Sequence, residues 1–159
     1  MKSIQKALFL LVIASLVFLQ ACQKALVIKN VNYAQNIESV LEPDDEGTVS
    51  DVRHGIRFSV LSLQATEFEQ DSTKVIRQIR LIRNNQGYYF ITANNFKHVY
   101  VMKPAKGELK LENKILVNES GISNPALNWR SPLVELVGLG STEQLFLTEN
   151  GIIKPQEEE

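Results

Sequence analysis

Short apolar segments separated by Gly, Pro and Asn follow one another from Ile56 to the end of the chain. The clearest pattern lies at residues 108–118, where apolar and polar side chains alternate and only Asn113 interrupts the alternation. A period of two puts successive side chains on opposite faces of a strand. This segment is therefore predicted to be a strand with one buried face.

Further strands are predicted where β-branched or aromatic residues form a short run between turn residues. Their ranges are 25–31, 74–83, 88–92, 97–102, 133–139 and 144–148. Residues 56–63 also alternate, but the phase changes between Val60 and Leu61, which predicts a β-bulge at that point. Asn150-Gly151 predicts a hairpin with a type I′ turn, because both residue types accept a positive φ.

Three segments are less regular. Residues 36–42 place their apolar side chains at helical spacing, which predicts a short helix or turn. Residues 74–83 fit either a helix or a strand, and their β-branched content favours the strand. Residues 119–130 are rich in Ser, Asn, Gly and Pro and are predicted to be a loop that carries Trp129.

These strand lengths and spacings are typical of all-β domains. We predict a single antiparallel β-sandwich or β-barrel domain at residues 22–154. An N-terminal signal helix at residues 1–21 precedes the domain, and residues 155–159 form an acidic, disordered tail.

The N-terminal segment has the layout of an export signal. Lys2 and Lys6 make a positive start, and the run from Ala7 to Leu19 contains no charge. A membrane-spanning helix needs about 20 apolar residues, whereas the apolar core of a secretory signal needs about 7 to 15. The alternative is a buried core helix, but such a helix is seldom apolar on every face.

The signal ends in Leu19-Gln20-Ala21-Cys22, which resembles the lipobox of bacterial lipoproteins. Gln20 stands where the family prefers a small residue. The resemblance implies cleavage before Cys22, a diacylglycerol thioether on its sulfur and an amide-linked acyl chain on its nitrogen. Together these chains would be enough for stable membrane anchoring. Gln23 occupies the position at which Asp retains enterobacterial lipoproteins at the inner membrane, so the resemblance favours the outer membrane.

Composition narrows the chemistry further. The chain has 17 basic and 18 acidic side chains, so nothing in the balance favours a nucleic-acid partner. Cys22 is the only cysteine. If lipid occupies its sulfur, the domain has no disulfide, no thiol nucleophile and no zinc–thiolate site. No cofactor is predicted beyond the covalent lipid.

Catalytic and metal motifs are weak. No G-x-S-x-G motif is present, and no motif surrounds His54 or His98, the two histidines. The acidic residues around Gly47 are adjacent rather than alternate, which indicates a solvated turn rather than a calcium loop. Scattered carboxylates such as Glu67, Glu69 and Asp71 leave a glycosidase-type pair open.

Three groups of residues are candidates for partner binding. Arg77, Arg80 and Arg83 lie on one predicted strand, and the alternative reading is a charged edge strand that resists aggregation. The tyrosines Tyr88, Tyr89 and Tyr100 lie on two consecutive predicted strands, and the alternative reading is ordinary β packing. Trp129 and Arg130 are residue types that dominate interface energies.

The sequence favours a membrane-anchored envelope lipoprotein that acts as a non-enzymatic binding or assembly module, with an envelope protein as partner. One alternative is an envelope hydrolase built from scattered acids and a histidine. Another is a carrier or sensor for a small apolar ligand. A cleft in which a histidine meets carboxylates would favour the hydrolase, and an enclosed apolar cavity would favour the carrier.

Overall fold

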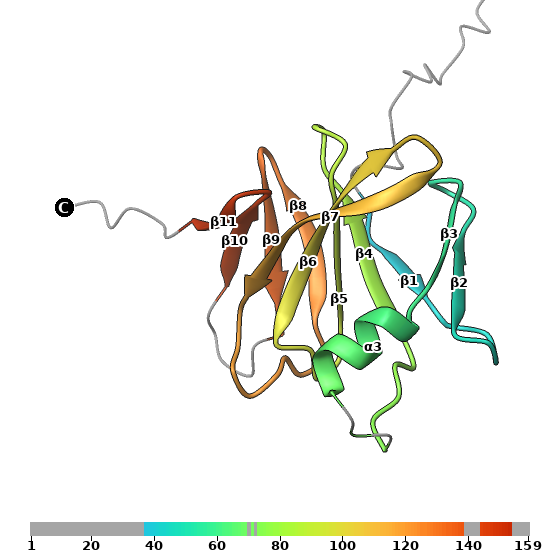
Figure 1. Cartoon of the computed structure of the whole chain (residues 1–159). Helices are drawn as coiled ribbons and strands as arrows, with labels where there is room; N and C mark the ends of the chain where they lie inside the picture. Colours follow the sequence, from blue (N-terminus) through green and yellow to red (C-terminus); the bar gives the residue numbers. More distant parts are fainter. Residues whose placement is uncertain (1–36, 70, 72, 139–143, 154–159) are drawn as a thin grey trace, which may run out of the picture. The chain divides into compact units, whose positions relative to one another are not determined.

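Five antiparallel strands form the central sheet of the domain, in the order β1-β4-β5-β6-β7 (Figure 1). The computed structural model describes residues 37–69, 71, 73–138 and 144–153, all within one compact unit, 32–159. The strands of the central sheet are β1 (Ser39–Leu41), β4 (Ile79–Arg83), β5 (Tyr89–Ala93), β6 (His98–Ala105) and β7 (Glu108–Leu116).

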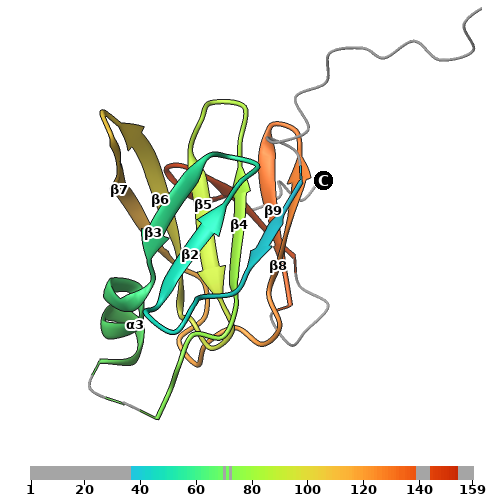
Figure 2. The ribbon, with the colours of Figure 1, turned by 90° about the vertical axis from the view of Figure 1, so that its right-hand side faces the viewer.

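Two smaller β structures and one helix surround the central sheet. The outer sheet has the order β11-β10-β9-β8, with β8 (Ala126–Arg130), β9 (Leu133–Val137), β10 (Leu145–Thr148) and β11 (Gly151–Ile153). A separate hairpin pairs β2 (Thr48–Asp51) with β3 (Ile56–Ser59), and α3 (Leu61–Phe68) follows it directly. Figure 2 shows this hairpin and α3 in front of the central sheet.

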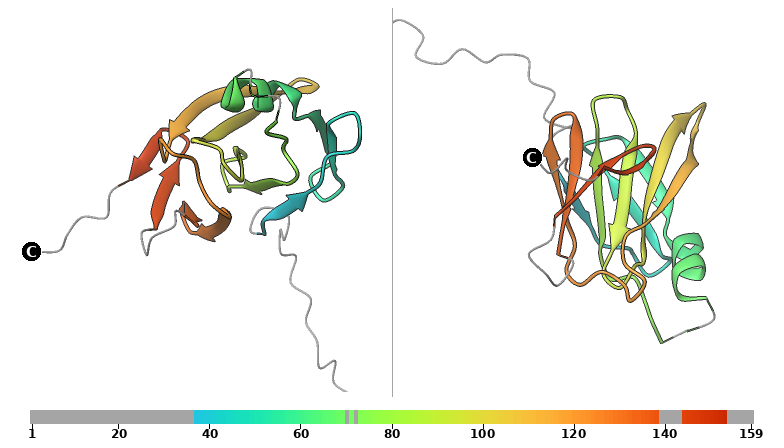
Figure 3. Two further views of the ribbon diagram at one scale, coloured as in Figure 1. Left: turned by 90° about the horizontal axis from the view of Figure 1, so that it is seen from below. Right: turned by 90° about the vertical axis from the view of Figure 1, so that its left-hand side faces the viewer.

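The central sheet is buried on both faces. We call the face that packs on β2, β3 and α3 the helix face, and the face that packs on the outer sheet the sheet face (Figure 3). Leu81, Ile91 and Phe96 belong to the core of the helix face, whereas Phe90 and Val101 belong to the core of the sheet face. Every residue of β5 is buried, because this strand lies in the middle of the layers.

A carboxylate connects the two sheets at their shared margin. Glu38 accepts a hydrogen bond from the backbone N–H of Leu127 on β8 at 2.7 Å and one from Arg80 on β4 at 3.1 Å. Hydrogen bonds to ionised groups are stronger than neutral ones. Glu38 therefore fixes the start of β1 between the sheets.

The prediction of an all-β, antiparallel architecture is confirmed, and the central sheet does not close into a barrel. The strands at 88–92, 97–102, 108–118, 133–139 and 144–148 are present within a few residues of their predicted bounds. The strand chosen for 74–83 is confirmed for its second half, β4. A register shift between Val101 and Met102 lies opposite the break in alternation at Asn113.

Four local predictions are wrong. Residues 39–41 form a strand instead of a helix or turn, because pairing with β4 outweighs the local spacing. The phase change at Val60 marks the end of β3 and the start of α3 instead of a bulge. Trp129 and Arg130 lie on β8 instead of in a loop. The hairpin at Asn150-Gly151 is present, but only Gly151 has a positive φ, so the turn is not type I′.

Several predictions fall on parts of the chain that are not described. The signal at residues 1–21, Cys22, the strand at 25–31 and the tail at 155–159 lie outside the described residues. Within the described ranges, no helix has the length and apolar content of a membrane span.

Candidate functional site

An apolar cleft lies between the β3–α3 connection and the β6–β7 hairpin, and we call it the hairpin cleft. Its volume is about 320 Å³. The apolar side chains that line it are Phe58, Leu63, Ile91, Met102 and Leu109, and its polar lining residues are Arg57, Ser59, Ser62 and Glu108. Apolar walls with a few polar groups are typical of binding sites, and this volume is at the lower end of their range.

The apolar surface continues outside the hairpin cleft. Leu111 is the cross-strand partner of Met102, so the two side chains lie on the same face of the β6–β7 hairpin. The Leu111 side chain is 55% exposed. The cleft and Leu111 together form a continuous apolar strip along this hairpin.

A buried carboxylate holds the other end of α3 against the central sheet. Glu67 accepts hydrogen bonds from the backbone N–H of Lys97 at 2.7 Å, from His98 Nδ1 at 2.8 Å and from the Tyr100 hydroxyl at 2.5 Å. The Lys114 ammonium is 4.0 Å away. We call these groups the Glu67 cluster. Because both carboxylate oxygens have partners, the buried charge is compensated.

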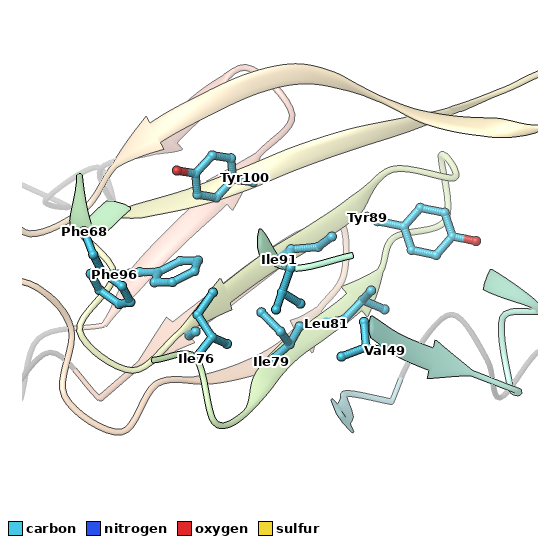
Figure 4. Close-up of a cluster of buried hydrophobic side chains, with 11 residues drawn as sticks. Val49, Phe68, Ile76, Ile79, Leu81, Tyr89, Ile91, Phe96 and Tyr100 are labelled. Atoms are coloured by element: carbon cyan, nitrogen blue, oxygen red, sulfur yellow. The ribbon is translucent and has the colours of Figure 1, made fainter. Parts of the chain in front are cut away.

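The Glu67 cluster changes the acidity of its tyrosine. Burial raises the pKa of Tyr100 above its ordinary value of 10.0, and the hydrogen bond to Glu67 and the negative charge of Glu67 raise it further. The hydroxyl therefore stays protonated and acts as a donor. In Figure 4, Tyr100 lies with Phe96 and Phe68 at one end of the apolar core of the helix face, and Tyr89 lies at the other end.

A second carboxylate orders the β2–β3 turn. Asp51 contacts His54 Nδ1 at 2.6 Å and accepts a hydrogen bond from the backbone N–H of Arg53 at 2.9 Å. Burial acts to raise the pKa of Asp51, but hydrogen bonds from Ser39 and His54 and the charge of His54 outweigh it, so the pKa is below 3.8. The His54 ring also packs edge-on against Tyr89, with centroids 5.4 Å apart.

Each histidine thus meets a carboxylate, yet neither pair lines a described cleft. The linings of the hairpin cleft and of two clefts near residues 42–47 and 73–78 contain neither His54 nor His98. Among the described residues, no group of three His, Cys, Asp or Glu side chains is arranged to hold a metal ion. Glu67 and Asp51 bind backbone amides, which is the behaviour of structural carboxylates.

The three tyrosines proposed for partner binding do not share a surface. Tyr89 is 4% exposed and Tyr100 is 2% exposed, both in the core of the helix face. Tyr88 is half-buried on the sheet face, with the Lys103 ammonium 5.7 Å from its ring centroid. The rings of Tyr89 and Tyr100 are therefore inside the domain.

The basic candidates are also dispersed. Arg80 pairs with Glu38, and the Arg83 guanidinium lies 5.5 Å from the Tyr89 ring centroid. Arg77 is exposed in the irregular segment before β4. Arg130 pairs with the buried Glu135 at 3.0 Å on the outer face of the outer sheet. Trp129 is half-buried against the core of the sheet face.

The acidic segment around Gly47 is a hydrogen-bonded turn. Asp44 Oδ1 accepts bonds from the backbone N–H groups of Glu46 and Thr48 at 3.1 and 2.8 Å. This arrangement is the Asx-type turn expected for Asp in such a position. Asp44 Oδ2 also lies 3.9 Å from the exposed Arg57 guanidinium, so the turn is solvated, as the sequence indicates.

Sequence reasoning did not identify the hairpin cleft or the Glu67 cluster. Glu67 and Tyr100 are 33 residues apart, and their meeting depends on how α3 crosses the central sheet. One usable signal was present: His98 and Tyr100 alternate on a predicted strand, so they share a face. Comparisons with protein-family models, with curated proteins and with solved structures found no match.

Proposed function

We propose that this protein is a bacterial envelope lipoprotein anchored through Cys22, and that its domain is a non-enzymatic module that binds an envelope protein. The observation that carries the proposal is the segment Leu19-Gln20-Ala21-Cys22 behind an uncharged apolar run. Lipid on the sole cysteine would commit the chain to a membrane surface. A domain held at that membrane surface would meet other proteins of the same envelope, so we expect its ligand to be one of them.

The hairpin cleft is the binding site that the geometry supports best. Its apolar walls and polar rim suit an apolar side chain of a partner, surrounded by hydrogen-bonding groups. Pairing of a partner strand with the edge of β7 is less well supported. That strand carries a register shift and the exposed lysines Lys110 and Lys114, which are features that protect edge strands from pairing.

The hydrolase alternative would rest on His98, because its Nδ1 faces Glu67 and its Nε2 would serve as the base. The geometry gives this alternative less support. The two Glu67 oxygens also accept hydrogen bonds from the Lys97 backbone N–H and the Tyr100 hydroxyl. The linings of the described clefts do not include His98. The carrier alternative would use the same hairpin cleft, so the binding experiment must separate a protein from a small ligand.

The anchor is tested by mass spectrometry of the mature protein from bacterial membranes. We expect an N-terminal Cys22 that carries a diacylglycerol and an acyl chain. Cys22→Ala should abolish incorporation of labelled palmitate. Unchanged labelling of that variant would contradict the proposal.

The binding site is tested with a photo-crosslinking amino acid at Ser62, which lines the hairpin cleft. The matched control is Thr66, an exposed residue one turn further along α3 that does not line it. We expect a discrete protein adduct from position 62 and none from position 66. Leu109→Trp should fill the cleft and remove the adduct, whereas Leu116→Trp on the same strand should keep it.

The same preparation separates the alternatives. A small apolar molecule that co-purifies with the protein and is lost in Leu109→Trp, without any protein adduct, would favour the carrier. Turnover of an envelope polymer that is lost in His98→Ala would favour the hydrolase.

A further inference from the structure

The described part of the chain begins at one end of the domain, which we call the Ile37 end. The register of β1 with β4 pairs Ser39 with Leu81, so Ile37 is level with Arg83 when that register is continued. Arg53 in the β2–β3 turn donates to the carbonyl oxygen of Ile37 at 3.2 Å. The β2–β3 and β4–β5 turns therefore lie at the Ile37 end, at the top of Figure 1.

The β6–β7 hairpin extends beyond this level at the same end. Arg83 pairs with Tyr89, Tyr89 pairs with Met102, and Met102 pairs with Leu111. Residues 103–110 thus project past the row of residues that is level with Ile37. We call residues 103–110 the hairpin tip.

Positive charge gathers at the Ile37 end. The basic side chains there that are not paired with a buried acid are the exposed Arg53, Lys103, Lys106 and Lys110 and the half-buried Arg83. The surface acids there are Glu108, Glu112 and Glu149. The other acids there are Glu38, Asp51 and Glu135, each of which contacts Arg80, His54 or Arg130. Lys103 and Lys110 are cross-strand partners; the Lys110 ammonium lies 3.3 Å from Glu108, and the Lys103 ammonium lies 5.7 Å from the Tyr88 ring centroid.

The opposite end of the domain has the opposite sign. Its loops at 42–47 and 69–78 contain the acidic residues Glu42, Asp44, Asp45, Glu46, Glu69 and Asp71 and the basic residues Lys74 and Arg77. The domain therefore has an electrical polarity along the strand direction, with its positive end where the described chain begins.

An exposed apolar side chain accompanies the positive charge. Val52, at the tip of the β2–β3 turn, is 94% exposed. Basic residues next to exposed apolar residues are the combination that binds anionic bilayer surfaces.

We propose that the Ile37 end is the face that contacts the membrane, and that the hairpin tip and the β2–β3 turn bind anionic phospholipid headgroups. This inference rests on the lipid anchor at Cys22. Residues 23–36 span at most about 50 Å when fully extended, so the anchor alone does not decide which end meets the bilayer. Charge complementarity decides it, since an anionic surface attracts the positive end and repels the acidic loops.

The test uses the full mature protein, extracted with its lipid and reconstituted in phosphatidylcholine vesicles with or without phosphatidylglycerol. A fluorescent probe is placed on a single added cysteine in Val52→Cys or, as the matched control, in Val75→Cys. Val75 is 63% exposed and lies beside the acidic loops. The vesicles contain lipids with a quencher on the headgroup.

We expect quenching of the probe at position 52 but not at position 75, only with phosphatidylglycerol, and weakened by added salt. Lys106→Gln with Lys110→Gln should lower the ratio of quenched to unquenched probe roughly fivefold per lysine. The matched pair Lys74→Gln with Lys97→Gln should leave it unchanged.

Equal quenching at the two positions, or quenching at position 75 alone, would overturn the proposed orientation. Mass spectrometry of the same sample reports lipid on Cys22. Absence of that lipid would overturn the proposed function together with the orientation, whereas lipid with the wrong quenching pattern would overturn the orientation alone.

Discussion

On the sheet face, the buried core that joins the central and outer sheets is mainly apolar, with Phe90, Val101 and Leu136 among its members. The buried Thr92 adds a hydroxyl that donates to the His98 carbonyl oxygen at 3.1 Å. On the helix face, the apolar core is interleaved with the Glu67 cluster and is bordered by the hairpin cleft. Apolar packing alone stabilises without specifying a unique orientation, whereas a satisfied polar cluster fixes one. The two faces both carry a buried apolar core, and the helix face adds the polar contacts that position the site.

The largest expected effect is on the sheet face. Phe90→Ala removes a fully buried ring and leaves a cavity, so we expect the free energy of unfolding to fall by about 3 to 5 kcal/mol. Met102→Ala, at the hairpin cleft on the helix face, should cost less than half as much because its side chain is only partly buried. Urea unfolding of both variants measures this, and equal losses would contradict the comparison.

The next effect is on the Glu67 cluster. Glu67→Ala leaves the Lys97 N–H, the Tyr100 hydroxyl and the His98 ring without their acceptor, so we expect a loss of about 2 to 4 kcal/mol. Glu112→Ala, which removes an exposed acid on β7, is the control and should change stability by less than about 0.5 kcal/mol. If Glu67→Ala matched that control, Glu67 would not fix α3.

The helix face should also set the pH range of stability. The pKa of Asp51 is below 3.8 in the folded domain, so its contribution is present above that pH and is lost as the pH falls through the folded value. The pKa of Tyr100 is raised, so its contribution is present below pH 10.0 and is lost as the pH rises further.

Unfolding measured across pH tests these two limits. Asp51→Asn should weaken the acid limb and leave the alkaline limb unchanged; part of the acid limb remains because hydrogen bonds from Thr73 lower the pKa of Asp71. Tyr100→Phe should weaken the alkaline limb and leave the acid limb unchanged; part of the alkaline limb remains because burial raises the pKa of Tyr89. The Phe90→Ala variant should lower the whole curve without changing its shape, since phenylalanine does not titrate.

The smallest effect on stability is expected at Leu111. Its side chain is mostly exposed, so Leu111→Ser should change the free energy of unfolding by less than about 0.5 kcal/mol. The same change should reduce the yield of the adduct from position 62, because it makes the apolar strip beside the hairpin cleft polar. If Leu111→Ser lowered the free energy of unfolding but kept the adduct yield, Leu111 would contribute to the core and not to partner binding.

The sequence predicted the elements whose burial follows a simple period. Residues 108–118 alternate because β7 is an edge strand whose inner and outer side chains have different surroundings. The spacing of apolar residues within 36–42 indicated a helix or turn. The segment is a strand because it pairs with β4, and a local pattern does not contain that pairing. The start of α3 was missed because Leu61 and Leu63 keep a period of two after the phase change, which is also the pattern of a strand that continues past a bulge.

The site was less predictable than the fold. Tyr88, Tyr89 and Tyr100 were candidates for partner binding, but the central sheet is covered on both faces. The hairpin cleft depends on the distance between two hairpins that are remote in the sequence. The pairing of Glu67 with Tyr100 likewise requires the position of α3, which no local pattern contains.

The complete burial of β5 has a consequence for how this domain can change over time. Each of the other strands has positions that are at least partly exposed, and those positions can exchange one polar residue for another at a lower cost. Every position from Tyr89 to Ala93 is closed to charge. A scan of all single substitutions should find no alternation of tolerant and intolerant sites there, and this strand should be the slowest part of the domain to diverge.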